Sequence, residues 1–425
     1  MREEFSGIAP GRLDVMGGIA DYSGSLLLQM PIAEETQVKL IKTENGIFKA
    51  HTDAEVGENE FSIDLSELNT GDLLEYREHV KSKSGGDWAL YVLGCFKILE
   101  QEKGLQWKGA EVHINSGVPA GKGVSSSAAI EVATMHAISK AYGVHMQPIE
   151  LALLAQKVEN HVVGAACGLM DQISVNFGLK DHLLPIICQP HEVYLPIPIP
   201  RGIRFIGLDS GIRHAVSAAS YGDVRTAAFM GYSIAMINAG KRIEERPYGG
   251  YLANISLHEF NHDFVKLIPE NISGKEFVEN FGVHIDPVTS VNEDKMYYPL
   301  ACALHPVQEN HRIKIFRDIL LNPDPAEFGE AGDLMFASHD GYNSVGLGEP
   351  VTNKMVELVK KWGKEHGIAG ARVSGGGSGG TVTMMITSNE GYDILMKIRE
   401  TMEKETGKSL KLFENSSDGA EFRRH

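Results

Sequence analysis

The chain has 425 residues, of which 43% are hydrophobic and 23% are charged. These proportions are typical of a globular protein with a sizeable core, and they exclude a disordered, collagen-like or coiled-coil chain. The length exceeds what one compact core usually holds, which predicts two lobes that meet at a ligand-binding cleft. Lys and Arg number 40 against 56 Asp and Glu, a formal charge of −16, and such a field repels nucleic acids and anionic membrane surfaces. A polyanionic ligand would therefore need a local site of backbone amides, a metal ion and a few cations.

The cysteines and the N-terminus bear on the cellular compartment. Four cysteines stand far apart and form no CxxC pair, which indicates neither a disulfide framework nor a zinc cluster. The first residues contain no basic region followed by an apolar run, and no stretch of 18 apolar residues occurs. We therefore expect a cytoplasmic protein that is neither exported nor membrane-bound.

The first hundred or so residues predict a β-rich entry followed by a helix. Residues 5–42 read as a strand, a glycine-rich loop from Gly11 to Gly24, and a second apolar run with partly alternating character. Apolar positions from 88 to 99 recur at helical spacing, and residues 110–114 form a short strand pattern.

Two helices are predicted next. Ser125 to Ser127 offer N-cap hydroxyls before the run AAIEVATMHAISKAY, and Gly143 ends it. The second helix begins near Pro148, because proline is favoured in a first turn, and it carries Glu159.

The proline-rich stretch 194–202 is the best candidate for a crossing between lobes, because its prolines continue neither a helix nor a central strand. We therefore expect an N-terminal domain over residues 1–195 and a C-terminal domain over residues 196–425. The second domain shows helical runs at 224–239, 325–337 and 352–365, and then a strand, a glycine loop and a strand over 368–387.

The most specific local signal is GVPAGKGVSSSAA at 117–129, where a strand passes into a helix. Gly121 and Gly123 allow the backbone to approach a ligand closely, first-turn amides favour anions, and the serine hydroxyls add donors and a possible Mg²⁺ ligand. This combination indicates a nucleotide triphosphate site, although Lys122 is followed by glycine and the loop is not a P-loop. The alternative is a helix cap with a flexible turn.

The loop GGGSGG at 375–380 satisfies GxGxxG, but the following residues TVTMMIT are strand-like, whereas a dinucleotide fingerprint opens a helix. We interpret it as a turn between strands, with a ligand-facing role and a purely conformational role both open.

The segment HEFNH at 258–262 matches the HExxH pattern of zinc proteases. No third ligand is marked nearby, and 17 histidines make such a coincidence unsurprising. A polar helix surface capped by Ser256 is the preferred interpretation.

Taken together, these segments resemble the signature motifs of the GHMP kinase superfamily in their usual order, and in detail the galactokinase-like members. The similar segments are PGRLDVMGGIADYSG at 10–24, GDWALYVLGC at 86–95, GKGVSSSA at 121–128, AACGLMDQIS at 165–174, DSGIRH at 209–214, ALHPVQENHR at 303–312, DLMFASH at 333–339 and SGGGSGG at 374–380. The first is nearly the same string as in the kinase domain of the plant L-arabinokinases. The resemblance spans nearly the whole chain, and it implies an α+β, two-lobed GHMP kinase fold with a central cleft.

Such kinases transfer phosphate from ATP to the anomeric hydroxyl of a sugar with the help of Mg²⁺, and the resemblance carries their residue roles to matching positions. It implies that Asp171 is the base or hydroxyl-orienting carboxylate and that Arg12 is its cationic partner. The implied ligand sites are Gly121, Gly123, Ser125, Ser126, Ser127 and Ala128 for ATP, Trp88 for its base, Ser127 and Glu159 for Mg²⁺, and Asp21, Gly18, Ile19 and Tyr221 for the sugar. Without the resemblance, Trp88 reads as a core residue, Glu159 as a solvated helix carboxylate and Asp171 as part of an Asx turn.

One departure from the galactokinases concerns the sugar. Those enzymes carry Glu-His where this chain has Gly18-Ile19, and the two side chains gather around the C6 hydroxymethyl group. L-Arabinopyranose has the galacto arrangement at its other carbons and lacks that group. The resemblance therefore implies an ATP-dependent sugar 1-kinase that prefers L-arabinose, acting as a monomer or homodimer on small molecules. Galactokinase activity is the alternative, and a GHMP-fold sugar sensor without catalysis is the alternative from another class.

Overall fold

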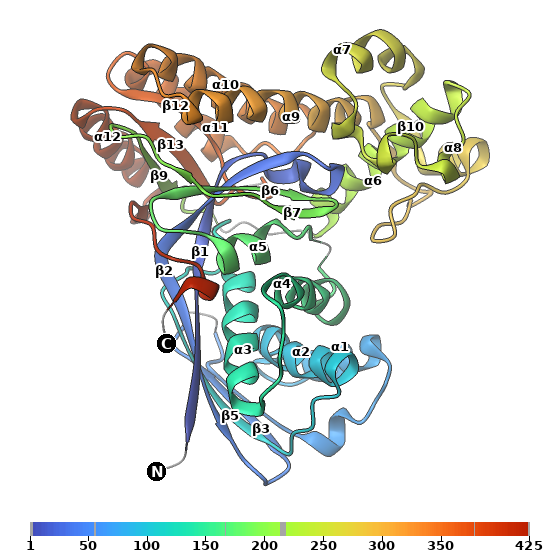
Figure 1. Ribbon diagram of the computed structural model, residues 1–425, viewed down its shortest axis with the longest axis vertical. Coiled ribbons are helices and arrows are strands. Elements are labelled where there is room, and N and C mark those ends of the chain that lie inside the picture. The colour runs from blue at the N-terminus through green and yellow to red at the C-terminus, as the bar shows by residue number, and fades with distance from the viewer. Residues whose placement is uncertain (1–2, 55–56, 166, 213–217, 378, 424–425) are drawn as a thin grey trace. The chain divides into compact units, whose positions relative to one another are not determined.

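The computed structural model describes residues 3–54, 57–165, 167–212, 218–377 and 379–423 (Figure 1). Four residues of the motifs quoted above, Ala166, Arg213, His214 and Ser378, lie outside the described residues. The chain divides into two compact units, each assembled from separate segments. The first unit comprises Met1–Leu13, Met30–His182 and Asn415–His425, and the second comprises Asp14–Gln29 and Leu183–Glu414.

These units differ from the expected division at residue 195. The proline-rich stretch lies inside the second unit, where Ile197–Pro198 forms the short strand β8. The chain changes unit within two long strands, β1 (Glu4–Met16) and β2 (Leu26–Lys42), and again after His182 and Glu414. A continuous strand carries no proline or composition signal where it leaves one core and enters another, so these changes are invisible in the sequence.

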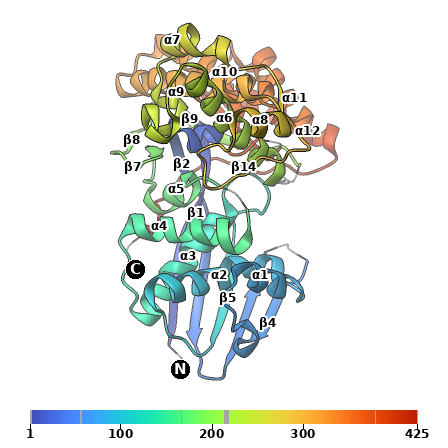
Figure 2. The same cartoon turned by 90° about the vertical axis from the view of Figure 1, so that its right-hand side faces the viewer.

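The first unit is a sheet with helices on one face (Figures 1 and 2). Its strands run in the order β4-β3-β5-β2, and β1 pairs with β2. The bounds of the further strands are Ile47–Thr52 for β3, Glu60–Asp64 for β4 and Ala110–Ser116 for β5. The helices are α1 (Leu73–Lys81), α2 (Gly86–Lys103), α3 (Ser126–Tyr142), α4 (Pro148–Lys157) and α5 (Met170–Phe177). Apolar side chains of the sheet and of α1 to α4 form one core between them.

Local patterns explain these elements well. The predicted helices at 88–99 and after Ser125, and the strand at 110–114, are confirmed as α2, α3 and β5. Helix α3 ends at Gly143, which has a left-handed backbone as a C-cap requires. The predicted loop from Gly11 is partly wrong, because β1 continues through Gly11 to Met16 and only the short turn Gly18–Ser23 separates it from β2. Apolar residues of β1 stand on both sides of Gly11, and the glycine alone does not end the strand.

The second unit contains a four-stranded sheet in the order β12-β13-β9-β14, and β6, β7 and β8 join the N-terminal part of β2. Its strands are β6 (His182–Cys188), β7 (His191–Val193), β9 (Arg204–Asp209), β10 (Ile272–Ser273), β11 (Met296–Tyr297), β12 (Ile368–Val373), β13 (Thr381–Ile386) and β14 (Leu412–Phe413). Its helices are α6 (Ala218–Asn238), α7 (Leu257–Glu259), α8 (Gly274–Phe281), α9 (Pro299–Leu321), α10 (Phe328–Ser344), α11 (Pro350–Leu358) and α12 (Asn389–Thr406).

The three helical runs predicted in this half are confirmed as α6, α10 and α11. The prediction that the glycine loop separates two strands is also confirmed, since β12 and β13 on either side of it are antiparallel and Val373 pairs with Val382. Among the described residues, no helix combines the length and the apolar character needed to cross a bilayer.

Helix α10 lies directly against strand β12 at Gly332, where a methyl group would stand 1.9 Å from the carbonyl oxygen of Ala369. We predict that Gly332→Ala lowers the free energy of unfolding by about 1 to 3 kcal/mol, because backbone on both sides has to shift. Gly329→Ala is the matched control, since that glycine lies on the same helix with no heavy atom within 4 Å of an added Cβ. Urea unfolding of both variants measures the difference, and equal midpoints would contradict the close approach.

Candidate active site

Arg12 and Asp171 form an ion pair in the first unit. Arg12 lies in β1, and Asp171 lies in the first turn of α5. The guanidinium donates from Nε and Nη2 to Asp171 Oδ1 at 3.0 and 2.8 Å. The Arg12 side chain is only 3% exposed, whereas that of Asp171 is 27% exposed. The pair therefore holds a partly accessible carboxylate in one orientation.

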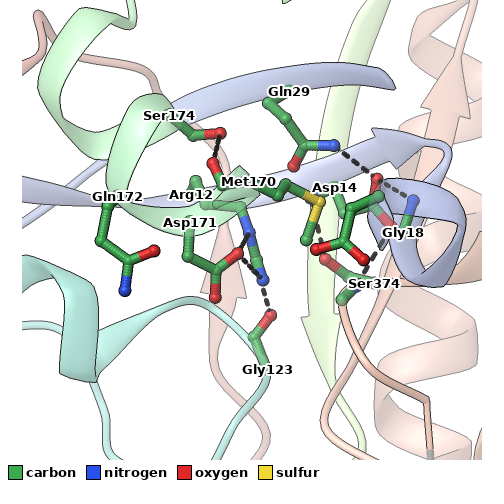
Figure 3. A network of polar contacts seen from close by, with 12 residues as sticks. Arg12, Asp14, Gly18, Gln29, Gly123, Met170, Asp171, Gln172, Ser174 and Ser374 are labelled. Atoms are coloured by element: carbon green, nitrogen blue, oxygen red, sulfur yellow. Dashed lines mark hydrogen bonds and ion pairs between the residues drawn. The ribbon is translucent and has the colours of Figure 1, made fainter. Parts of the chain in front are cut away.

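The same arginine is bonded to the glycine loop between β5 and α3. Arg12 Nη1 donates to the Gly123 carbonyl at 2.6 Å, and the Arg12 amide donates to the Val124 carbonyl at 3.1 Å. Figure 3 shows the guanidinium between Asp171 and Gly123. The Arg12 guanidinium thus binds both the Asp171 carboxylate and the glycine loop. The contact with Asp171 was expected from the sequence, and the contact with the loop was not.

The glycine loop leads directly into the first turn of α3. Gly121, Gly123 and Ser125 have left-handed backbones, with φ of 70°, 68° and 61°. Ser126, Ser127 and Ala128 follow in the first turn of α3, where backbone amides and the helix dipole favour an anion. The expected capping by Ser125 is not observed, because its left-handed conformation turns its side chain away from the geometry of an N-cap and it makes no cap hydrogen bond.

The buried Glu131, the half-buried Glu159 and the buried amide of Gln172 lie beside this loop. Glu159 lies on the widened turn Val158–Val163 that follows α4, and its carboxylate accepts a hydrogen bond from Ser127. Gln172 Nε2 donates to Glu159 Oε2 at 2.9 Å and to Glu131 Oε2 at 3.1 Å. Sequence reasoning missed Glu131 and Gln172. A glutamate inside the apolar run of α3 and an amide next to Asp171 were the available signals.

Burial and electrostatic repulsion keep these acids from ionising readily. Desolvation, followed by the negative charge of Asp171, raises the pKa of Glu159 to about 7. The pKa of Glu131 lies well above its ordinary value, again because of burial first and then the Glu159 charge.

The predicted Mg²⁺ ligands Ser127 and Glu159 are within hydrogen-bond distance of each other. A hydroxyl and one carboxylate are hard oxygen donors, and Mg²⁺ commonly uses one or two carboxylates together with substrate phosphates. Within the described ranges, no group of three or more His, Cys, Asp and Glu could hold a metal ion. The Ser127 hydroxyl and the Glu159 carboxylate, as hard oxygen donors, fit a cation that also binds phosphate oxygens.

Trp88 lies in the first turns of α2 and is partly buried against the core of the first unit. Its indole Nε1 donates to the Glu58 carbonyl at 2.7 Å. The hydrogen bond thus fixes the orientation of the indole. A fixed ring is compatible both with a core residue and with a residue that contacts the base of ATP.

In the second unit, the predicted sugar residues occupy the turn between β1 and β2 and the helix α6. Tyr221 of α6 donates its hydroxyl to Asp21 Oδ1 at 2.8 Å. Gly18 and Ile19 stand three and two residues before Asp21, and the Ile19 side chain is buried among the apolar residues of this unit. The structure thus brings together all four residues within the second unit.

A buried carboxylate that sequence reasoning missed holds this turn. Asp14 Oδ1 accepts from Gln29 Nε2 at 2.7 Å and from the Gly18 amide at 3.2 Å, as Figure 3 shows. Its Oδ2 accepts from Arg372 Nη1 at 2.7 Å, and both side chains have no exposed surface. The sequence signal for Asp14 and for Arg372 was a charged residue inside an apolar strand, β1 for the first and β12 for the second.

The HEFNH segment has the predicted cap. The Ser256 hydroxyl accepts from the Glu259 amide at 3.2 Å. The Glu259 carboxylate, which a zinc protease would use as its base, instead accepts from the Tyr248 hydroxyl at 2.5 Å.

Known structures share this fold. The crystal structure of Lactococcus lactis galactokinase complexed with galactose superposes with a TM-score of 0.77 over 98% of this chain and 94% of that chain, at 20% sequence identity. A mevalonate kinase structure superposes with a TM-score of 0.59 over 97% of this chain and 99% of that chain, at 15% identity. The chain therefore has the α+β fold of the GHMP kinases.

Sequence comparisons agree. Residues 90–178 match the GHMP kinases N terminal domain, and residues 326–404 match the GHMP kinases C terminal domain. The L-arabinokinase of Arabidopsis thaliana is 37% identical over 98% of this chain, which spans only 46% of that protein's length. The galactokinase of Chloroflexus aggregans is 28% identical over 90% of this chain and 84% of its own length. The chain thus contains the N- and C-terminal domains of the GHMP kinases, and it resembles their galactokinase-like members.

The raised pKa of Glu159 predicts how stability varies with pH without Mg²⁺ and nucleotide. The folded protein keeps this proton up to about pH 7, whereas an unfolded glutamate loses it near 4.5. Because the folded state binds more protons in this window, the free energy of unfolding falls as pH rises from about 4.5 to about 7. We predict that Glu159→Gln makes this fall shallower, as measured by urea unfolding at several pH values.

The control for this experiment is Glu78→Gln, which removes the same charge from the exposed side of α1. It should keep the pH dependence of the wild-type protein. An unchanged slope in Glu159→Gln would show that this carboxyl does not hold its proton in the folded state.

Proposed function

We propose that this protein transfers the γ-phosphoryl group of ATP to the anomeric hydroxyl of a sugar, and that L-arabinose is its preferred substrate. The observation that carries the proposal is the Arg12 guanidinium, bonded at once to the Asp171 carboxylate and to the Gly123 carbonyl of the glycine loop. It puts an acid, a cation and the amide-rich start of a helix in one place. Phosphoryl transfer needs little beyond such positioning and charge neutralisation.

In this proposal Asp171 accepts the proton of the anomeric hydroxyl while that oxygen forms a bond to the γ-phosphorus. The bond between the γ-phosphorus and the bridging oxygen breaks, and ADP leaves with the electron pair. Arg12 orients Asp171 and stabilises the negative charge that spreads over the transferred group. The 27% exposure of Asp171 supports this role, because the carboxylate is oriented and still accessible.

The nucleotide site is proposed at residues 121–128, where the two glycines and the first turn of α3 present backbone amides to phosphates. Trp88 would contact the base. Ser127 and Glu159 would hold Mg²⁺, which supplies charge neutralisation at the phosphates when it is bound.

The sugar site is proposed at Gly18, Ile19, Asp21 and Tyr221. The Asp21 carboxylate, with one oxygen already bonded to Tyr221, is suited to sugar hydroxyl groups. The preference for L-arabinose is supported by the 37% identical relative, an L-arabinokinase, and by the absence of a polar pair at Gly18-Ile19. Galactokinases are also among the relatives, and D-galactose is therefore the competing substrate.

A sugar-binding protein without catalysis is the alternative from another class. The presence of Arg12, Ser127, Glu159 and Asp171 speaks against it, because a sensor has no need of a complete catalytic set. Coupled measurement of ADP release with and without sugar separates the two. ADP release that depends on L-arabinose supports the kinase, and binding of sugar and ATP without ADP release would support the sensor.

We predict that Asp171→Asn folds but loses about 10² to 10⁴-fold in kcat, because an amide cannot accept the hydroxyl proton. The ADP-release assay measures the loss, and circular dichroism checks the fold. ATP binding should persist, since the glycine loop is unchanged. A variant that retains more than about a tenth of the wild-type kcat would remove Asp171 from the proton transfer.

We predict that kcat/KM for L-arabinose exceeds that for D-galactose by at least about tenfold, since burying an unpaired C6 hydroxyl costs roughly 1 to 3 kcal/mol and tenfold needs about 1.4. A competition assay with both sugars and Mg-ATP measures the ratio, and NMR of the product locates the phosphate. Equal or reversed preference would make the protein a galactokinase in function.

A further inference from the structure

The turn that carries the proposed sugar residues is held by a tyrosine from a distant part of the chain. Tyr342 of α10 is fully buried, and its hydroxyl accepts from the Ile19 amide at 3.0 Å. The same hydroxyl donates to the Gly375 carbonyl at 2.6 Å. It thus joins the turn between β1 and β2 to the glycine loop between β12 and β13.

The hydroxyl of Tyr342 also fills the space where residue 18 would carry a side chain. A Cβ on Gly18 would stand 1.6 Å from this oxygen and 2.7 Å from Asp14 Oδ2. Gly18 has a φ of +45°, which side chains other than glycine rarely adopt. A larger residue at position 18 would therefore clash with Tyr342 unless the tyrosine were replaced as well.

The ring of Tyr342 is packed against two further side chains. The Arg372 guanidinium lies 5.2 Å from the ring centroid, and the His305 ring meets it edge to face at 5.7 Å. Arg372 is itself fixed by its buried ion pair with Asp14. The Tyr342 hydroxyl beside Gly18 thus has a fixed position, and it already donates one hydrogen bond and accepts another.

We propose that Tyr342 is a specificity-determining residue of the sugar site, which admits aldopentopyranoses and rejects sugars with an exocyclic hydroxymethyl group. The inference rests on the proposed function, since it takes the turn at Gly18 to Asp21 as the sugar site. The Tyr342 oxygen occupies the volume beside Gly18. Because its proton is donated to Gly375, this hydroxyl cannot donate to an extra sugar hydroxyl without losing that bond. The discrimination then comes mainly from Tyr342, with Ile19 contributing through the backbone amide that the tyrosine holds.

The contact between Gly18 and Tyr342 affects any exchange of the sugar residues. A Gly18→Glu, Ile19→His variant introduces the polar pair of the galactokinases, but a side chain at position 18 would collide with the Tyr342 hydroxyl. The informative comparison is between this double variant and the same variant combined with Tyr342→Leu. We expect the double variant to fold poorly and the triple variant to recover folding and to gain activity on D-galactose.

Two single variants test the tyrosine itself. Tyr342→Phe removes both hydrogen bonds and keeps the ring, and Tyr342→Leu also frees the volume. We expect the ratio of kcat/KM for L-arabinose over D-galactose to fall at least about threefold in Tyr342→Phe and at least about tenfold in Tyr342→Leu. The change should lie in KM for the sugar, with KM for ATP within about twofold of the wild-type value. Calorimetric sugar binding without nucleotide gives the same ratio independently of catalysis.

Tyr232→Phe is the matched control, because this buried tyrosine of the same unit loses one hydroxyl bond, to the Pro247 carbonyl at 2.7 Å. It should leave the sugar ratio unchanged. If Tyr342→Leu fails to fold, Tyr342→Phe decides alone, and a ratio within about 1.5-fold of wild type in Tyr342→Phe would overturn the proposal. A wild-type protein that phosphorylates neither sugar would instead overturn the proposed function, so the two failures are distinguishable.

Discussion

The ion pair between the enclosed Arg12 and the partly exposed Asp171 is the interaction on which the candidate active site depends. Arg12 is almost fully enclosed, and the Asp171 carboxylate supplies the negative charge that compensates its guanidinium. Because the same guanidinium bonds the Gly123 carbonyl, the pair fixes strand β1, helix α5 and the glycine loop at once. An acid held in this way is oriented before any substrate arrives, so no reorganisation is needed at the moment of reaction.

The two glutamates beside this pair ionise less readily than free glutamates. Burial raises the pKa of both Glu159 and Glu131, and the charge of Asp171 adds to the first shift as that of Glu159 adds to the second. The Gln172 amide offsets part of the repulsion by donating to both glutamates. A cation on Ser127 and Glu159 would offset more. Apolar residues in this place would stabilise the fold better, and a cation bound as in the proposed function would account for the carboxylates.

The second unit also contains an ion pair, which holds the turn between β1 and β2. Asp14 and Arg372 form an ion pair without exposed surface, and around it the amide of Gly18 and the ring of Tyr342 are held in place. The turn that contains Gly18 is therefore bonded on several sides. Under the proposed function, such a preorganised turn would lose little entropy when a sugar binds, and it would select sugars by shape.

The sequence by itself determined the family, the helices α2 and α3 and the residues Arg12, Ser127, Glu159 and Asp171 as site candidates. Apolar periodicity, a stop at Gly143 and glycine-serine chemistry are local properties, and they can be read along the chain. Only the tertiary structure decided that Gln172 bridges two glutamates and that Tyr342 fills the space over Gly18, since Tyr342 bonds a backbone amide 323 positions away. The passage of β1 and β2 through both units was equally hidden. Contacts between distant residues depend on how closely the elements that carry them pack. The sequence shows that residue 18 is a glycine, but only the structure shows that the Tyr342 hydroxyl occupies the space of its missing side chain.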